Sequence, residues 1–155
     1  AHALLKPPHV NLSTGPKVAR GVASLIAAGL VKSAHDVSDG GLLCAVAEML
    51  IAGSTSSVPL GAQVDLSAVL AESLPTPRSM LAASVAAFSE TPSRYVLELT
   101  ESDWRSARQQ LAQAGIPASV VGVLNGSGLF DVTERLLDPI PVSELTKVWS
   151  KPLDW

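Results

Sequence analysis

The strongest structural signal in this sequence is the stretch Ser33-Ala34-His35-Asp36-Val37-Ser38-Asp39-Gly40-Gly41-Leu42. Residues 30–37 are predicted to form a strand, and residues 38–41 contain the Asp and Gly residues that are typical of a turn. From Leu42 to Gly53 apolar residues recur at helical spacing, which predicts a helix. A strand that passes through a tight glycine turn into a helix is the building unit of folds with crossover connections.

Strands and helices alternate in the same way on both sides of this stretch. A helix is predicted from residue 14, because Pro16 lies in its first turn, to Gly29. The later predicted elements are strands over 63–66, 94–99 and 119–124, helices over 75–88, 100–115 and 142–149, and a hairpin turn at 125–128 that returns through 129–133. Thr100 and Asp103 resemble a capping box for the helix over 100–115.

This order predicts an α/β (α+β) fold with a mixed sheet and crossover helices on at least one face. We expect a single domain over residues 1–155. Within it, residues 1–12 form an extended lead-in that contains Pro7-Pro8, and residues 142–155 form a C-terminal helix and tail.

Composition excludes several classes of function. The 155 residues carry a net charge of −3 without a Lys/Arg cluster, which argues against nucleic-acid binding. Cys44 is the only cysteine, so an internal disulfide and a multi-thiolate metal site are excluded. The sequence contains no apolar run of about 18 residues and therefore predicts no membrane span. A cytoplasmic location is expected.

Charged residues make up 16% of the chain, against about 25% in typical domains. We therefore expect some apolar surface to face a partner or a part of the protein that is absent from this sequence. The chain begins Ala1-His2 without a methionine, and we expect it to be a piece of a longer protein.

The turn at residues 38–41 is the best candidate for a binding site. Free backbone N–H groups at a helix N-terminus attract anions, and glycines let a phosphate approach closely. Asp36 and Asp39 could hold Mg²⁺ or orient a polar ligand. The structural alternative is that Asp39 only caps the helix, that Gly40-Gly41 only turn the chain, and that His35 makes a local hydrogen bond.

The second candidate segment is Ser89-Glu90-Thr91-Pro92-Ser93-Arg94. Glu90 and Arg94 lie four residues apart at a strand entry, where they could bind a polar ligand, Arg94 through its planar guanidinium group. The alternative is that they form an ion pair that fixes the loop.

Four stretches resemble the last domain of phosphoribosylformylglycinamidine synthase, in the order in which that family has them. They are Pro7-Pro8-His9-Val10-Asn11-Leu12, the 33–42 stretch with Ala45-Val46-Ala47-Glu48-Met49, Phe88-Ser89-Glu90-Thr91-Pro92-Ser93-Arg94-Tyr95, and Leu145-Thr146-Lys147-Val148-Trp149-Ser150-Lys151-Pro152-Leu153. The resemblance covers essentially the whole chain. It implies a fold like the C-terminal domain of aminoimidazole ribonucleotide synthetase.

The resemblance also implies a role in de novo purine biosynthesis. The full enzyme would be an ATP-dependent C–N ligase that amidates formylglycinamide ribonucleotide with ATP, Mg²⁺ and glutamine-derived ammonia. In this family the catalytic histidine and most metal-binding acids lie in the N-terminal domains, so the isolated chain is expected to be inactive, with no catalytic or metal-binding residue of its own. If the chain has this role, we expect nucleotide contacts from His35, Asp36, Ser38, Asp39, Gly40 and Gly41, and substrate contacts from Ser89, Glu90 and Arg94.

The implied partners are the N-terminal ATP-binding domains of the same chain, a glutaminase, and a small accessory subunit or domain. A homodimer is also compatible with the sequence, whereas nucleic acid and membranes are not expected partners. ATP or ADP would bind with Mg²⁺ in the full-length enzyme, and none is expected to bind tightly to this chain alone. The alternatives are a purely structural packing or dimerisation domain without ligand contacts, or a protein related to selenophosphate synthetase.

Overall fold

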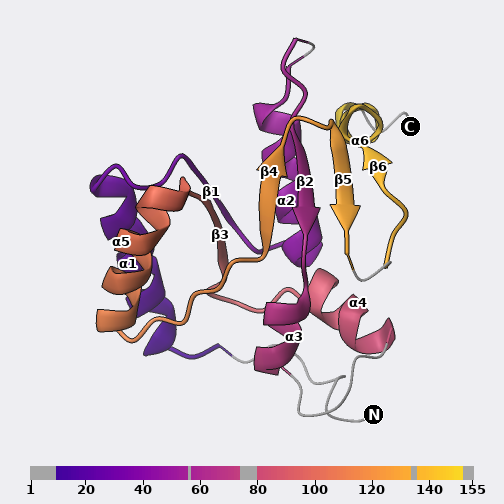
Figure 1. Ribbon diagram of the computed structural model, residues 1–155. Helices are drawn as coiled ribbons and strands as arrows, with labels where there is room; N and C mark the ends of the chain where they lie inside the picture. Colours follow the sequence, from indigo (N-terminus) through magenta and orange to yellow (C-terminus); the bar gives the residue numbers. More distant parts are fainter. Residues whose placement is uncertain (1–9, 56, 74–79, 134–135, 152–155) are drawn as a thin grey trace. The chain divides into compact units, whose positions relative to one another are not determined.

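The computed structural model describes residues 10–55, 57–73, 80–133 and 136–151 (Figure 1). Most of the predicted lead-in and the last residues of the predicted tail lie outside these ranges. Along the chain the elements are α1 (Thr14–Ala27), β1 (Ser33–Asp36), α2 (Gly41–Gly53), β2 (Gly61–Val64), α3 (Ser67–Ser73), α4 (Met80–Phe88), β3 (Tyr95–Glu98), α5 (Glu101–Gln113), β4 (Gly122–Asn125), β5 (Leu129–Val132), β6 (Ile140–Pro141) and α6 (Val142–Ser150).

Two compact units divide the chain. Unit 1 contains the described residues up to Ala45 together with Ser89–Ser119, and unit 2 contains Val46–Phe88 together with the described residues from Val120 onwards. The prediction of one domain over residues 1–155 stays a prediction. None of the helices in the described ranges has the length and apolar character that crossing a membrane requires.

In unit 1, β1 and β3 form a two-stranded antiparallel sheet, in which Ser33 lies opposite Glu98 and Asp36 lies opposite Tyr95. The buried core of the unit joins helices α1 and α5 and the chain that follows α5. Its members are Leu25, Ala107, Leu111 and Ile116. Both helices were predicted from apolar residues at helical spacing, and part of each predicted face is buried, whereas Ile26 on α1 is exposed.

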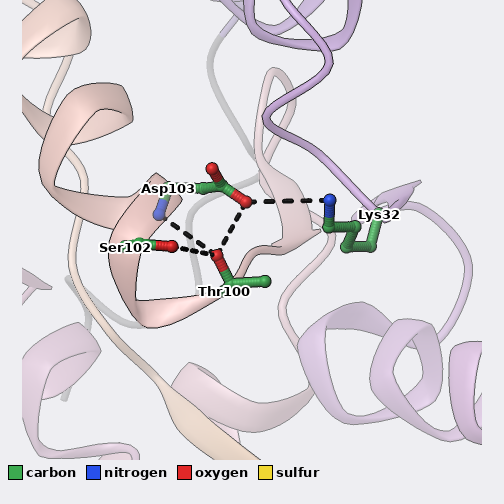
Figure 2. A network of polar contacts seen from close by, with 4 residues as sticks. All are labelled: Lys32, Thr100, Ser102 and Asp103. Atoms are coloured by element: carbon green, nitrogen blue, oxygen red, sulfur yellow. Dashed lines mark hydrogen bonds and ion pairs between the residues drawn. The ribbon is translucent and has the colours of Figure 1, made fainter.

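The predicted cap of α5 is confirmed at Thr100 (Figure 2). Its Oγ1 accepts a hydrogen bond from the backbone N–H of Asp103 at 3.2 Å and donates one to Asp103 Oδ2 at 2.7 Å. Lys32 Nζ lies 3.7 Å from the same Oδ2. The network differs from a standard capping box, because the acidic side chain binds the capping hydroxyl rather than the backbone N–H of the cap.

We expect Thr100→Ala to lower the free energy of unfolding by about 1 kcal/mol, because the substitution leaves a backbone N–H of the first turn without its acceptor. Urea unfolding of the chain measures the loss. Ser106→Ala is the matched control, because Ser106 is an exposed residue in the middle of the same helix, where alanine is favoured. A loss in Thr100→Ala no larger than that in the control would contradict the capping role.

Unit 2 contains a four-stranded sheet in the order β4-β2-β5-β6. The β2–β5 pair is parallel and the β2–β4 and β5–β6 pairs are antiparallel, so the sheet is mixed. One face of β2 and β5 is buried through Ala62, Val64, Phe130 and Val132. The predicted α+β fold with a mixed sheet is therefore confirmed.

The predicted hairpin at residues 125–128 is wrong as a strand pairing, because β2 lies between β4 and β5. The chain does turn there, since Asn125 Oδ1 accepts a hydrogen bond from Ser127 N at 2.9 Å. The turn crosses the start of β2 at Gly61. A Cβ atom on Gly61 would contact Ser127 Oγ and lie 2.6 Å from the carbonyl oxygen of Leu129. Because glycine has no side chain, the turn at residues 125–128 can cross over β2 at this point.

Helix α3 and strand β6 were not predicted. The predicted helix over 75–88 is observed as α4 from Met80 onwards, and its first residues lie outside the described ranges. Helix α6 agrees with the predicted C-terminal helix. Strands β1, β3 and β4 are shorter than predicted, with β1 limited to Ser33–Asp36, and β2 begins two residues before the strand predicted over 63–66.

Candidate functional site

The turn between β1 and α2 is built around two consecutive glycines in the left-handed region. Gly40 has φ +78° and Gly41 has φ +75°, values that other residues rarely adopt. Gly41 N donates to the carbonyl of Ser38 at 3.0 Å, which closes the turn. A Cβ on Gly40 would also collide with the side chain of Cys44 in the first turn of α2. Glycine is therefore required at position 40 on two separate grounds.

Strand pairing places the second candidate segment beside this turn. β1 and β3 are antiparallel, so the end of β1 lies next to the start of β3. Val37 N donates to the carbonyl of Arg94 at 2.9 Å, which extends this pairing beyond the strands. The residues that precede β3 therefore lie next to the residues that follow β1.

Glu90 joins the two segments directly. Its Oε1 accepts a hydrogen bond from the backbone N–H of Gly40 at 3.0 Å, across fifty positions of sequence. Gly40 immediately precedes the first residue of α2, where backbone donors lack partners within the helix and the helix dipole favours negative charge. A carboxylate is therefore the type of group that this position attracts, and the protein supplies one itself.

The 89–94 segment is held by its own side chains as well. Arg94 Nη1 donates to Ser89 Oγ at 3.3 Å, which links the two ends of the segment. Ser93 has φ +66°, an uncommon conformation for a residue other than glycine. An ion pair between Glu90 and Arg94 stays a prediction.

His35 makes the local hydrogen bond that the structural alternative expected. Its Nδ1 lies 2.6 Å from the carbonyl oxygen of Asp36, and because a carbonyl can only accept, Nδ1 carries the proton in this contact. The same nitrogen lies 3.7 Å from Asp36 Oδ1. These contacts orient the imidazole ring along the end of β1.

The remaining predicted residues, Ser38 and Asp39, are exposed in the turn. Across the parts of the chain that the structure describes, no group of three or more His, Cys, Asp or Glu side chains is placed to hold a metal ion. The β1–α2 turn therefore combines backbone donors with the carboxylates of Asp36, Asp39 and Glu90. Such groups can bind and orient a polar ligand, and the assignment of nucleotide and substrate contacts stays a prediction.

Cys44 was not predicted to lie at the site. Cys44 lies four residues after Gly40, and this spacing of one helical turn could have indicated that the two residues are close. Their contact also depends on the backbone conformation of Gly40, which the sequence alone does not give. The side chain of Cys44 is half-buried.

A family model described as AIR synthase related protein, C-terminal domain, matches residues 3–134. The PurL subunit of phosphoribosylformylglycinamidine synthase from Alkaliphilus metalliredigens is 30% identical over 145 residues, which are 93% of this chain and 18% of that protein. The PurL subunit from Rhodopseudomonas palustris strain TIE-1 is 34% identical over 132 residues, which are 85% of this chain and 16% of that protein.

Solved structures agree on the fold. Phosphoribosylformylglycinamidine synthase II from Thermotoga maritima superposes with a TM-score of 0.71 at 20% identity, over 90% of this chain and 22% of that protein. A structure of Thermotoga maritima PurL complexed with ATP superposes with a TM-score of 0.67 at 20% identity, over 84% of this chain and 21% of that one.

The chain spans less than a fifth of the length of the curated relatives it matches. The sequence motifs and the mixed sheet agree with one family, whose model covers most of the 155 residues. The chain belongs to the AIR synthase related protein family, and it corresponds to the C-terminal domain of that family.

Proposed function

We propose that this chain is the C-terminal part of a phosphoribosylformylglycinamidine synthase, which amidates formylglycinamide ribonucleotide with ATP in purine biosynthesis. The observation that carries the proposal is similarity to PurL subunits over 93% of the chain. A Thermotoga maritima PurL structure holds that ribonucleotide, abbreviated FGAR, and others hold ATP or ADP. The partners would be the N-terminal ATP-binding domains of the same protein, a glutaminase and a small accessory subunit, in the cytoplasm.

Within that enzyme, the β1–α2 turn and the 89–94 segment would contribute contacts to the nucleotide and its phosphates. The hydrogen bond of 3.0 Å between Gly40 N and Glu90 Oε1 supports this role, because it brings the two predicted segments together. Asp36, Ser38 and Asp39 would orient polar groups of the ligand, with His35 at the strand end. Ser89 and Arg94 would contact the substrate.

The donor set of this chain does not fit a complete Mg²⁺ site. Mg²⁺ requires near-octahedral oxygen coordination, and the described residues contain no cluster of three candidate side chains. The Mg²⁺ of the whole enzyme would therefore take its protein ligands mainly from the domains that precede this one.

We expect calorimetry of the isolated chain with ADP and Mg²⁺ to detect weak binding or none. The reason is that the chain supplies one side of the proposed site and that the backbone N–H of Gly40 already binds Glu90. A dissociation constant of micromolar order would contradict this expectation.

In the full-length protein we expect Asp39→Ala to raise the dissociation constant for nucleotide by about tenfold, the cost of one hydrogen bond to a charged group. Asp138→Ala is the matched control, because Asp138 is an exposed acid in unit 2. Both variants are tested for unchanged thermal stability before titration. Equal nucleotide affinities in Asp39→Ala and the unsubstituted protein would exclude the proposed contact.

A purely structural role in packing or dimerisation is the second candidate. It is favoured by the apolar side chains that β4 exposes, among them Val123, with 67% of its surface accessible. Packing through β4 could accompany ligand contacts at the β1–α2 turn, because the turn belongs to unit 1 and β4 belongs to unit 2, whereas a purely structural role excludes such contacts.

A further inference from the structure

The two glycines give the β1–α2 turn an unusual freedom of backbone conformation. Both have positive φ, and glycine adopts positive and negative φ with similar ease. Within the turn, Gly41 N donates to the carbonyl of Ser38, and this bond leaves the N–H of Gly40 to a partner outside the turn. A turn of this kind needs an outside contact if it is to present its backbone groups in one arrangement.

Glu90 supplies that contact from the segment before β3. Its Oε1 accepts the hydrogen bond from Gly40 N at 3.0 Å, immediately before the first residue of α2. A hydrogen bond to an ionised acceptor is stronger than one between neutral groups, and the helix dipole favours negative charge at this end of α2. The carboxylate of Glu90 is therefore well suited to hold the backbone of Gly40.

The segment that carries Glu90 is itself held at several points of unit 1. Arg94 Nη1 donates to Ser89 Oγ at 3.3 Å, and the carbonyl of Arg94 accepts from Val37 N at 2.9 Å. A Cβ on Gly15 would lie 2.8 Å from Ser93 Oγ, so Ser93 packs against the first turn of α1. Glu90 thus reaches the turn from a segment that is tied to β1 and α1, and its contact can restrain the turn.

The charge of Glu90 argues against a direct contact with a phosphate group. A phosphate beside this carboxylate would bring like charges together, which is unfavourable. The oxygen Oε1 is also already occupied by the N–H of Gly40. Glu90 can therefore favour the binding of a phosphate-bearing ligand through the turn that it holds, rather than by touching the ligand.

We propose that Glu90 is a positioning residue, which holds the β1–α2 turn in its ligand-binding conformation through the hydrogen bond to Gly40 N. The inference rests on the proposed nucleotide contacts of the turn, and it gives Glu90 a role other than the substrate contact expected from the sequence. When the binding conformation is only partly populated, the apparent affinity falls by the same fraction. Loss of the contact therefore weakens binding although no group that touches the ligand is removed.

Hydrogen exchange at the Gly40 amide of the 155-residue chain tests the contact. In Glu90→Ala this amide exchanges about tenfold faster, because a hydrogen bond to a charged acceptor is lost. Glu90→Gln retains an acceptor oxygen and keeps most of the protection. Glu101→Ala is the matched control, because it removes the same charge from an exposed position of unit 1 on α5, and it leaves the exchange unchanged. The amide of Leu111, in the core of the unit, reports any general loss of stability.

Titration of the full-length protein with ADP and Mg²⁺ tests the consequence for binding. Glu90→Ala raises the dissociation constant by about tenfold, because the turn is no longer held. Glu90→Gln restores affinity to within about threefold of the unsubstituted protein, because the amide oxygen of glutamine accepts the same N–H. If Glu90 acted on the ligand through its charge, the glutamine variant would bind no better than the alanine variant.

The inference is overturned by exchange at Gly40 that Glu90→Ala leaves unchanged. It is equally overturned by the same nucleotide affinity in the Glu90→Ala and Glu90→Gln variants. A full-length protein in which no variant binds nucleotide would contradict the proposed function, and the exchange at Gly40 would then decide alone whether Glu90 holds the turn.

Discussion

Gly61→Ala is expected to lower the free energy of unfolding by about 3 kcal/mol, a large cost for the addition of one methyl group. The added Cβ would contact Ser127 Oγ and lie 2.6 Å from the carbonyl oxygen of Leu129 and 2.7 Å from Asn125 Oδ1. Because one of these atoms belongs to the backbone, the crossing loop cannot yield by a side-chain rotation alone. Urea unfolding of the chain measures the loss.

Gly126→Ala is the matched control in the same loop. A Cβ on Gly126 would have no neighbour within 4 Å, so alanine there is expected to be neutral or slightly stabilising. If β4 and β5 formed the simple hairpin that the Asn-Gly sequence suggests, Gly61 would not be crossed. Equal stabilities of the Gly61→Ala and Gly126→Ala variants would therefore contradict the observed strand order.

Leu25→Ala is expected to cost about 3 kcal/mol, because it removes a fully buried side chain from the core of unit 1 and leaves a cavity. Leu25 is 1% exposed and packs with Ala107, Leu111 and Ile116. Thermal or urea unfolding of the chain measures the effect.

The neighbouring Ile26 provides the control, because it is 50% exposed on the same helix. We expect Ile26→Ala to change stability by less than about 1 kcal/mol, since surface substitutions leave no cavity. A similar loss in the two variants would show that the core assignment of α1 is wrong.

Local sequence signals predicted helices α1 and α5, although they missed α3. Thr100 marks the start of α5 through a contact with Asp103, only three residues away, so the residues that form the cap are close together in the sequence. Helix α1 follows from apolar residues that recur on one face, and Leu25 is buried on that face. In both cases the decisive interactions lie within a few turns of the same element.

Strand order could not be predicted in the same way. Asn125-Gly126-Ser127-Gly128 is typical of a hairpin, and the local turn does form. Which strand lies beside β4 depends on β2, which is about sixty residues earlier, and on the small size of Gly61, where the loop crosses. Long-range pairing of this kind leaves no periodic pattern in the sequence.

At the candidate site, too, local features were predicted from the sequence and long-range contacts were not. The glycines at positions 40 and 41 predicted a turn, and the positive φ values of both residues explain why glycine is favoured at these positions. The contact of Glu90 with Gly40 joins residues fifty positions apart. The chemistry of their residues made both segments candidates, but only the antiparallel pairing of β1 and β3 explains why they meet.

The most direct test is an assay of the full-length protein that contains this chain, with formylglycinamide ribonucleotide, ATP, Mg²⁺ and ammonia as the reactants. The proposed function predicts ATP-dependent formation of the amidine product, with the Asp39→Ala variant requiring a higher ATP concentration than the Asp138→Ala control. A folded protein that binds nucleotide and forms no amidine would contradict the proposal.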